Sequence, residues 1–192
     1  ECLMPDLSEL DVRLQRILLL EALIGDRGLT RKMVLYRRNF VRLVDKAISE
    51  YQQARSAIVA QIEEMQRPTE EMIQTGRILY VFHFVDHFEN CINATARMLK
   101  LLDRIIASEE GRQIVPKLLR RAIEAYGKDV TSIRNAVEHM DEIIRGDELA
   151  VGQPIMLSIG GGGDCAVIAG YELKFDDLAL VLRRMHEVAQ RL

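Results

Sequence analysis

Apolar residues recur along the chain at intervals of three and four, which predicts helices over most of its length. A first helix is expected over residues 7–24, where leucines recur at helical spacing and Gly25 follows as a stop. The next pattern begins near Met33. From Phe40 to Met65 its steps alternate between four and three almost without fault, which indicates a helix-packing seam. We therefore predict one long helix that ends before Pro68.

A second long helix is expected from about residue 70 to residue 106, with Ile78 near the start of its seam. Two helices of roughly 35 residues, each about 50 Å long, should pack antiparallel when a short turn joins them. A second apolar face predicts that this helix lies centrally in the bundle; the face comprises Phe84, Met98, Leu101 and Ile105.

The C-terminal third changes character. After a break at 109–116 the helical pattern resumes and continues past Gly127 to Gly146. Within 154–173, two apolar runs flank four glycines, Gly160–Gly163, and predict a β-hairpin. A phosphate-binding loop would need a helix directly after these glycines, whereas a strand-like run follows them. We predict an all-α fold, one elongated bundle domain over 1–192, with this hairpin and a final helix over 175–192.

Composition narrows the class of protein. Hydrophobic residues make up 48% and charged residues 29% of the 192 residues, which excludes a disordered chain. No apolar run approaches the length of a membrane span, and the segment before Asp6 lacks the apolar centre of a signal peptide. Cys2, Cys91 and Cys165 lie far apart without CxxC spacing, which is typical of a reducing cytoplasm. We expect a cytoplasmic protein without a membrane anchor.

Charge is unevenly distributed. The net charge of −3 argues against nonspecific coating of nucleic acid. Basic residues nevertheless gather in 27–46 and in 112–134. The simplest interpretation of each stretch is a solvated helix face.

One helix contains a candidate metal-ligand pattern. His83, His87 and Cys91 follow one another at intervals of four, which could direct three ligands to one side. The sequence has no HExxH or Glu-x-x-His motif to support a zinc protease or a di-iron site. The expectation is ordinary packed side chains and no metal, with a metal- or ligand-binding bundle as an alternative.

The segment 133–142 is the most informative. At about 100° per residue, Asn135 and His139 lie nearly opposite Val137, the centre of the local apolar seam. His139 is therefore not expected in the core. Arg134 lies on the flank, about 140° from His139, so its long side chain or a second copy of the helix must close the gap. A simpler interpretation pairs Arg134 with Glu138, a surface ion pair that stabilises a helix by about 0.3–0.5 kcal/mol.

This segment resembles the Arg-x4–6-His motif of the HEPN superfamily, in the form Arg-polar-x3-His, at Arg134, Asn135 and His139. The resemblance covers about 30–146, and the hairpin and last helix would be additions to it. It implies an α-helical bundle with the motif near the start of a late helix. Many members are metal-independent ribonucleases of toxin, abortive-infection or other defence systems, and they commonly dimerise so that two motifs face one another.

The resemblance implies a role for each motif residue. His139 would move protons at the 2′-hydroxyl, Arg134 would stabilise charge on the phosphate, and Asn135 would orient His139 or hold the phosphate. Cleavage would need no cofactor and would leave 2′,3′-cyclic phosphate and 5′-hydroxyl ends. The remaining candidates, which would contact the RNA backbone, are Arg120, Arg121 and Lys128.

The implied partners are RNA, a second copy of the chain, and a restraining protein such as an antitoxin or a nucleotidyltransferase. Aromatic residues make up only 5% of the chain, so we expect poor reading of base sequence. Two alternatives remain open: a helical interaction or oligomerisation module without catalysis, and the metal- or ligand-binding bundle that would use His83 and His87.

Overall fold

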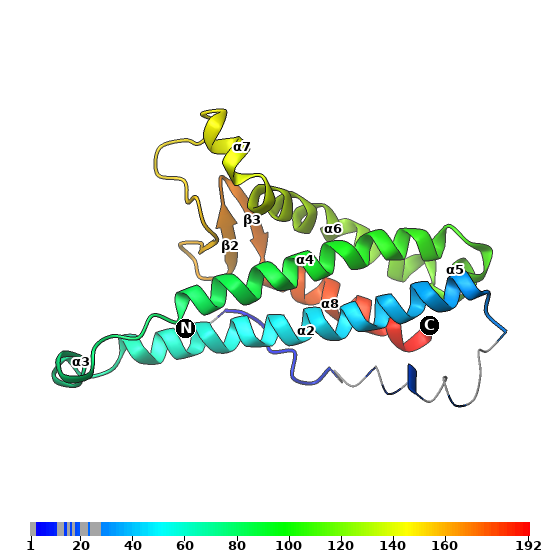
Figure 1. The fold of residues 1–192 in the computed structure, drawn as a ribbon, viewed down its shortest axis with the longest axis horizontal. Helices are drawn as coiled ribbons and strands as arrows, with labels where there is room; N and C mark the ends of the chain where they lie inside the picture. Colours follow the sequence, from blue (N-terminus) through cyan, green and yellow to red (C-terminus); the bar gives the residue numbers. More distant parts are fainter. Residues whose placement is uncertain (1–2, 11–13, 15, 17, 20–22, 24–27) are drawn as a thin grey trace.

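Two antiparallel helices form the long axis of the molecule (Figure 1). The computed structural model describes residues 3–10, 14, 16, 18–19, 23 and 28–192. Helix α2 (Arg31–Met65) packs along α4 (Val81–Ile106), and the short α3 (Thr69–Thr75) lies in the connection between them. The prediction of an elongated, mostly helical fold with a small β element near the C-terminus is confirmed.

The sequence accounts for both ends of α2. The hydroxyl of Thr30 accepts a hydrogen bond from the Met33 N–H and caps the first turn. The predicted seam is buried along the helix, and Phe40, Val44 and Tyr51 are fully inaccessible to solvent. The helix ends at Met65, before Pro68, as expected. Its 35 residues correspond to a helix about 52 Å long.

The predicted continuous helix from residue 70 to 106 is wrong. It is divided into α3 and α4 by residues 76–80, and Gly76 adopts a positive φ of 78° that ends α3. Ile78 is 47% exposed and does not belong to the seam. The second apolar face is present on α4, where Phe84, Met98 and Ile105 are buried. As predicted, α4 lies centrally, between α2 and α6 (Lys117–Glu138).

Helix α6 follows the predicted break. The break contains a short helix, α5 (Glu109–Ile114), capped by the hydroxyl of Ser108. α6 then continues past Gly127, whose missing side chain lets the backbone approach Leu99 of α4. The predicted helix to Gly146 is interrupted at His139, and α7 (Met140–Arg145) forms its last part.

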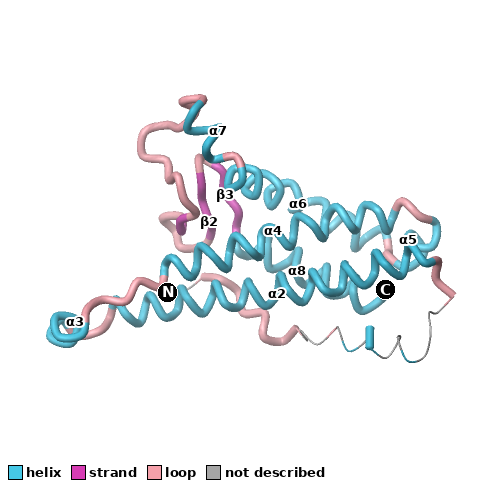
Figure 2. Tube along the Cα trace, viewed as in Figure 1, coloured by secondary structure: helices cyan, strands magenta, loops and turns pink. Residues whose placement is uncertain are grey.

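A three-stranded antiparallel sheet takes the place of the predicted two-stranded hairpin. Its order is β1 (Ser158–Ile159), β2 (Cys165–Ile168), β3 (Tyr171–Lys174), and Figure 2 shows β2 and β3 beside the end of α6. Gly160–Gly163 connect β1 to β2 as expected. β2 and β3 are joined by two residues, Ala169 and Gly170, both at positive φ, as a type I′ turn requires.

Helix α8 (Phe175–Arg191) confirms the predicted final helix. Its first residue joins an aromatic cluster in the core. The ring of Phe175 meets Phe84 and Phe88 edge-on, with centroids 6.5 Å and 5.6 Å away, and Phe84 and Phe88 stack at 5.2 Å. Because Phe175 directly follows β3, this cluster fixes the sheet to the bundle.

The helix predicted over residues 7–24 is only partly covered by the described residues. The described residues Leu7–Leu10 form a turn, so a helix does not begin at Leu7. Half of the predicted first helix, and Gly25, lie outside the described residues, whereas the described residues 16, 18–19 and 23 are helical. Among the helices that the structure describes, none has both the length and the apolarity to cross a membrane.

Candidate functional site

The motif residues lie where α6 gives way to α7. His139 has φ −112° and ψ 23°, outside helical geometry, while its N–H still donates to the Asn135 carbonyl at 2.9 Å. The His139 carbonyl accepts from the N–H groups of Glu142 and Ile143. The backbone therefore bends at His139, where the Glu142 N–H donates to the His139 carbonyl and not to that of Glu138, four residues back. The resemblance implied a motif near the start of a late helix, whereas these residues lie at the C-terminal end of α6.

A surface pocket of about 330 Å³ opens at this bend. Asn135 and His139 both line it, so the two residues face the same space, as the helical spacing predicted. The His139 side chain is 53% exposed and is not packed in the core. The pocket is completed by Ser132, Ala136, Glu142, Ile143 and Tyr171.

Arg134 does not line this pocket but is linked to it. Its guanidinium Nη1 donates to Asn135 Oδ1 at 3.2 Å, and Asn135 faces the pocket. Its Nη2 forms an ion pair with Glu138 one turn further along α6. The simple interpretation, an Arg134–Glu138 pair, is therefore correct for the isolated chain. Asn135 nevertheless brings the guanidinium to the edge of the space that His139 faces.

One acidic side chain contacts His139, and two others are close to it in sequence. Its Nδ1 lies 3.4 Å from Glu142 Oε2, and both side chains are more than half exposed. Glu138 precedes it, and Asp141, which pairs with Arg145 at 3.4 Å, follows. An imidazole in its neutral form has a ring nitrogen that can accept a proton, which is what a general base needs.

The proposed backbone contacts separate into two groups. Arg121 and Lys128 precede Asn135 by fourteen and seven residues, which places the three on one face of α6 at steps of about 10 Å. All three are exposed. Arg120 is partly buried and lies about 100° around the helix from Arg121. The exposed face therefore carries two of the three predicted cations toward the pocket.

The candidate metal ligands do not meet. His83 is exposed, whereas Cys91 is fully buried and burial raises the pKa of its thiol to about 12, so it is not a thiolate ligand. His87 Nδ1 lies 2.8 Å from Glu50 Oε2 on α2. Within the part of the chain that the structure describes, no three His, Cys, Asp or Glu side chains are placed to hold a metal ion.

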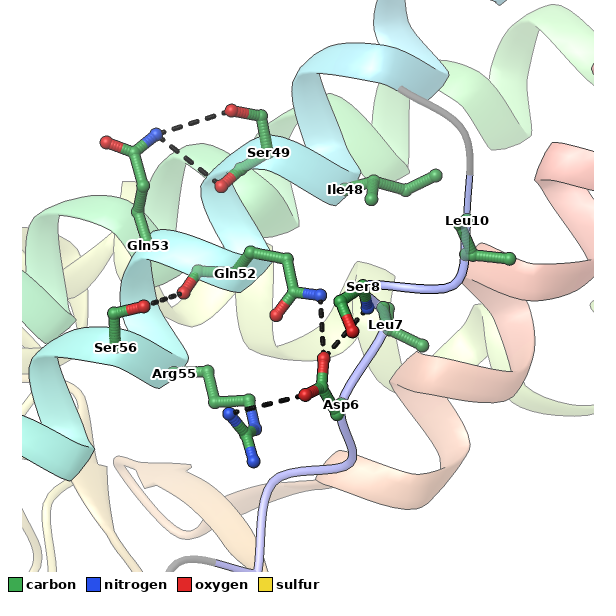
Figure 3. A pocket seen from close by; sticks show the side chains of 10 residues that line it. All are labelled: Asp6, Leu7, Ser8, Leu10, Ile48, Ser49, Gln52, Gln53, Arg55 and Ser56. Atoms are coloured by element: carbon green, nitrogen blue, oxygen red, sulfur yellow. Dashed lines mark hydrogen bonds and ion pairs between the residues drawn. The ribbon is translucent and has the colours of Figure 1, made fainter. Parts of the chain in front are cut away.

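A second polar pocket lies between residues 6–10 and α2 (Figure 3). Its polar groups bind one another: Gln52 Nε2 donates to Asp6 Oδ1 at 3.1 Å, and Arg55 lies 3.8 Å from the other oxygen. The Ser8 N–H also donates to Asp6, and these contacts lower the pKa of Asp6 to about 2. The pocket is the seam where the N-terminal segment docks on α2, and its groups serve that contact.

Tyr171 is the pocket residue that the sequence analysis missed. It begins β3 and reaches the pocket from an element far from the motif in sequence. Tyr171 is 47% exposed. The signal for it was the pair Gly170-Tyr171, a turn glycine followed by an aromatic residue, but only the fold brings it to His139.

The geometry thus assembles a histidine, an asparagine and a tyrosine in one pocket, with an arginine at its edge. The arrangement supplies a proton acceptor, an amide, an aromatic face and a cation. Comparisons of the chain with family models, with curated proteins and with solved structures find no match.

Proposed function

We propose that this chain is a metal-independent endoribonuclease similar to the HEPN ribonucleases, with its active site at the α6–α7 bend. The observation that carries the proposal is the linkage of Arg134 through Asn135 to the pocket that His139 faces. A half-exposed imidazole, in a pocket to which a guanidinium is linked through Asn135, offers both functions that RNA cleavage needs without a metal: a proton acceptor and a cation for the phosphate.

The reaction follows from these side chains. The 2′-hydroxyl of the substrate attacks the adjacent phosphorus while its proton passes to Nε2 of His139. The bond from phosphorus to the 5′-oxygen breaks, and that oxygen takes up a proton. Arg134 exchanges Glu138 for the phosphate and stabilises the charge that builds in the transition state. The products carry a 2′,3′-cyclic phosphate and a 5′-hydroxyl.

A second copy of the chain completes the site in this proposal. The attacking and leaving oxygens stand on opposite sides of phosphorus in an in-line displacement, so one imidazole does not reach both. A second motif across a two-fold axis supplies the proton for the leaving oxygen. It also brings a second arginine against Glu138 and Glu142, whose charges otherwise repel the phosphate.

The proposal also includes the cellular compartment of the reaction and a protein that restrains it. Cys91 and Cys165 are both free, which suits the reducing cytoplasm. A ribonuclease that degrades cellular RNA there requires restraint, and we propose a partner protein of the antitoxin or nucleotidyltransferase kind. Arg121 and Lys128 would guide the RNA backbone along α6 to the pocket.

The test is cleavage of a fluorescent single-stranded RNA in the presence of EDTA, with the product ends analysed by mass spectrometry. His139→Ala and Arg134→Ala should each abolish cleavage while the helical circular dichroism is kept. His83→Ala is the matched control, because it removes an exposed imidazole from α4. Activity should also rise more steeply than linearly with protein concentration if two copies form the site.

Cleavage that persists in either motif variant contradicts the proposal and points to another site or another protein. A chain that is inert on every RNA supports the second candidate, an interaction module. One observation favours that candidate: a pocket of about 490 Å³ between α6 and α8 is lined by Leu119 and Ala122, with Leu118 81% exposed at its edge. Leu118→Lys would then disrupt assembly while His139→Ala would not.

A further inference from the structure

The ring of Tyr171 is positioned to act on the same substrate as His139. It lines the pocket from β3, whereas Asn135 and His139 line it from α6 and from the bend, so the ring reaches the pocket from a separate element. The residue is nearly half exposed. The structural alternative, a ring buried to stabilise the sheet, does not fit that exposure.

The local backbone holds the ring in place. Ile168 and Tyr171 face one another across the two-residue turn, so the turn determines where β3 begins. Ala169 has a φ of 48°, in the left-handed region that alanine rarely adopts. The chain maintains this strained turn directly before the exposed tyrosine, and Phe175 anchors the other end of β3 in the core.

We propose that Tyr171 stacks against the nucleobase next to the scissile phosphate, and that it determines how tightly single-stranded RNA is held. The inference rests on the proposed ribonuclease function. Every base has an aromatic face, so stacking tolerates any sequence and favours single strands over duplexes. The apolar side chains of Ala136 and Ile143 in the same pocket suit a base better than a phosphate. The substrate is therefore single-stranded RNA with little sequence preference.

The proposal predicts a specific kinetic effect. A stacked base is held equally in the ground state and the transition state, so its loss raises KM and leaves kcat nearly unchanged. Replacing a stacking aromatic residue with alanine costs about 1–3 kcal/mol per base, which corresponds to about 5- to 150-fold in affinity. Tyr171→Leu should raise KM by a factor in this range, and Tyr171→Phe should retain the wild-type value. A merely structural role would change kcat and thermal stability as well.

A substrate change provides the matched control. An RNA with one abasic site beside the scissile phosphate should show the raised KM with the wild-type chain. With Tyr171→Leu, the abasic RNA should show no further rise in KM, because the two changes remove the same contact. If the abasic site and Tyr171→Leu each raise KM and the two factors multiply when combined, the stacking proposal is overturned.

A binding experiment separates this inference from the proposed function. The chain has no tryptophan, so Tyr171→Trp introduces a single indole whose fluorescence should be quenched by a 2′-O-methyl oligonucleotide, which cannot be cleaved. Tyr36→Trp on α2 is the control and should not respond. Quenching in a chain that never cleaves RNA supports the stacking site and contradicts the ribonuclease. Cleavage without quenching, and with an unchanged KM in Tyr171→Leu, overturns the stacking site and leaves the ribonuclease proposal standing.

Discussion

Replacing Glu138 with glutamine should raise the affinity for RNA about fivefold. The Arg134–Glu138 pair joins side chains that are 26% and 36% exposed, so breaking it costs about 0.3–0.5 kcal/mol. Removing a carboxylate near the bound phosphate relieves a further repulsion, which for unit charges about 6 Å apart is about 0.7 kcal/mol at the dielectric constant of water. Together these give about 1 kcal/mol, or about a factor of five.

The same change should leave the fold nearly as stable as before. Arg134 precedes Glu138, which is the less favourable order for such a helix pair. Glu138 is also the last residue of α6, at the negative end of the helix dipole, where a carboxylate is disfavoured. These two effects offset the lost ion pair, so the free energy of unfolding should change by less than about 0.5 kcal/mol.

The assay is fluorescence anisotropy of a labelled 2′-O-methyl oligonucleotide at fixed salt, with urea unfolding in parallel. Glu124→Gln is the matched control: it changes the net charge equally on α6, about 21 Å from Glu138 along the helix. The reasoning is refuted if Glu124→Gln gives the same gain. It is also refuted if the whole fivefold gain survives when Arg134→Ala is added, because only the relieved repulsion of about 0.7 kcal/mol, about threefold in affinity, is independent of Arg134.

Three further predictions concern the fold. Gly111→Ala should destabilise the chain by about 2–4 kcal/mol in urea unfolding, because its new Cβ would lie 2.1 Å from the Ile105 carbonyl oxygen; an unchanged midpoint would mean that α5 does not pack there. Ala169→Gly should stabilise it by about 0.5–1 kcal/mol by relieving the positive φ, whereas a loss would show that the methyl group packs usefully. The carboxyl of Asp6 has a folded-state pKa of about 2 against an ordinary 3.8, so its stabilising effect should be present above 3.8 and fall away toward about pH 2. The thermal midpoint of Asp6→Asn should therefore vary less across that range than that of the wild type, and equal slopes would contradict the contact with Gln52.

The parts of the fold that repeat a simple pattern could be predicted from the sequence. The seam of α2 and the amphipathic α8 are long and regular; α2 ends before Pro68, and α8 begins directly after β3. The division between α3 and α4 was missed because apolar residues continue through Ile78. Gly76, at positive φ, ends α3 although the apolar periodicity continues.

The site was predictable only in part. The outward position of His139 and its common face with Asn135 followed from helical spacing, and both line the pocket. The bend at His139 was not predictable, because neither proline nor glycine marks it. Tyr171 joins the pocket only through the pairing of β3, which local sequence does not encode.

The aromatic cluster around Phe175 has a consequence for anyone who engineers this protein. Only three residues separate Tyr171 from that buried ring, so one wall of the pocket is an extension of the hydrophobic interior. Trimming Phe175 to leucine would leave every pocket side chain chemically intact. It would nevertheless reduce the packing that holds β3 in place. A substitution in the core would therefore weaken substrate binding at the surface pocket.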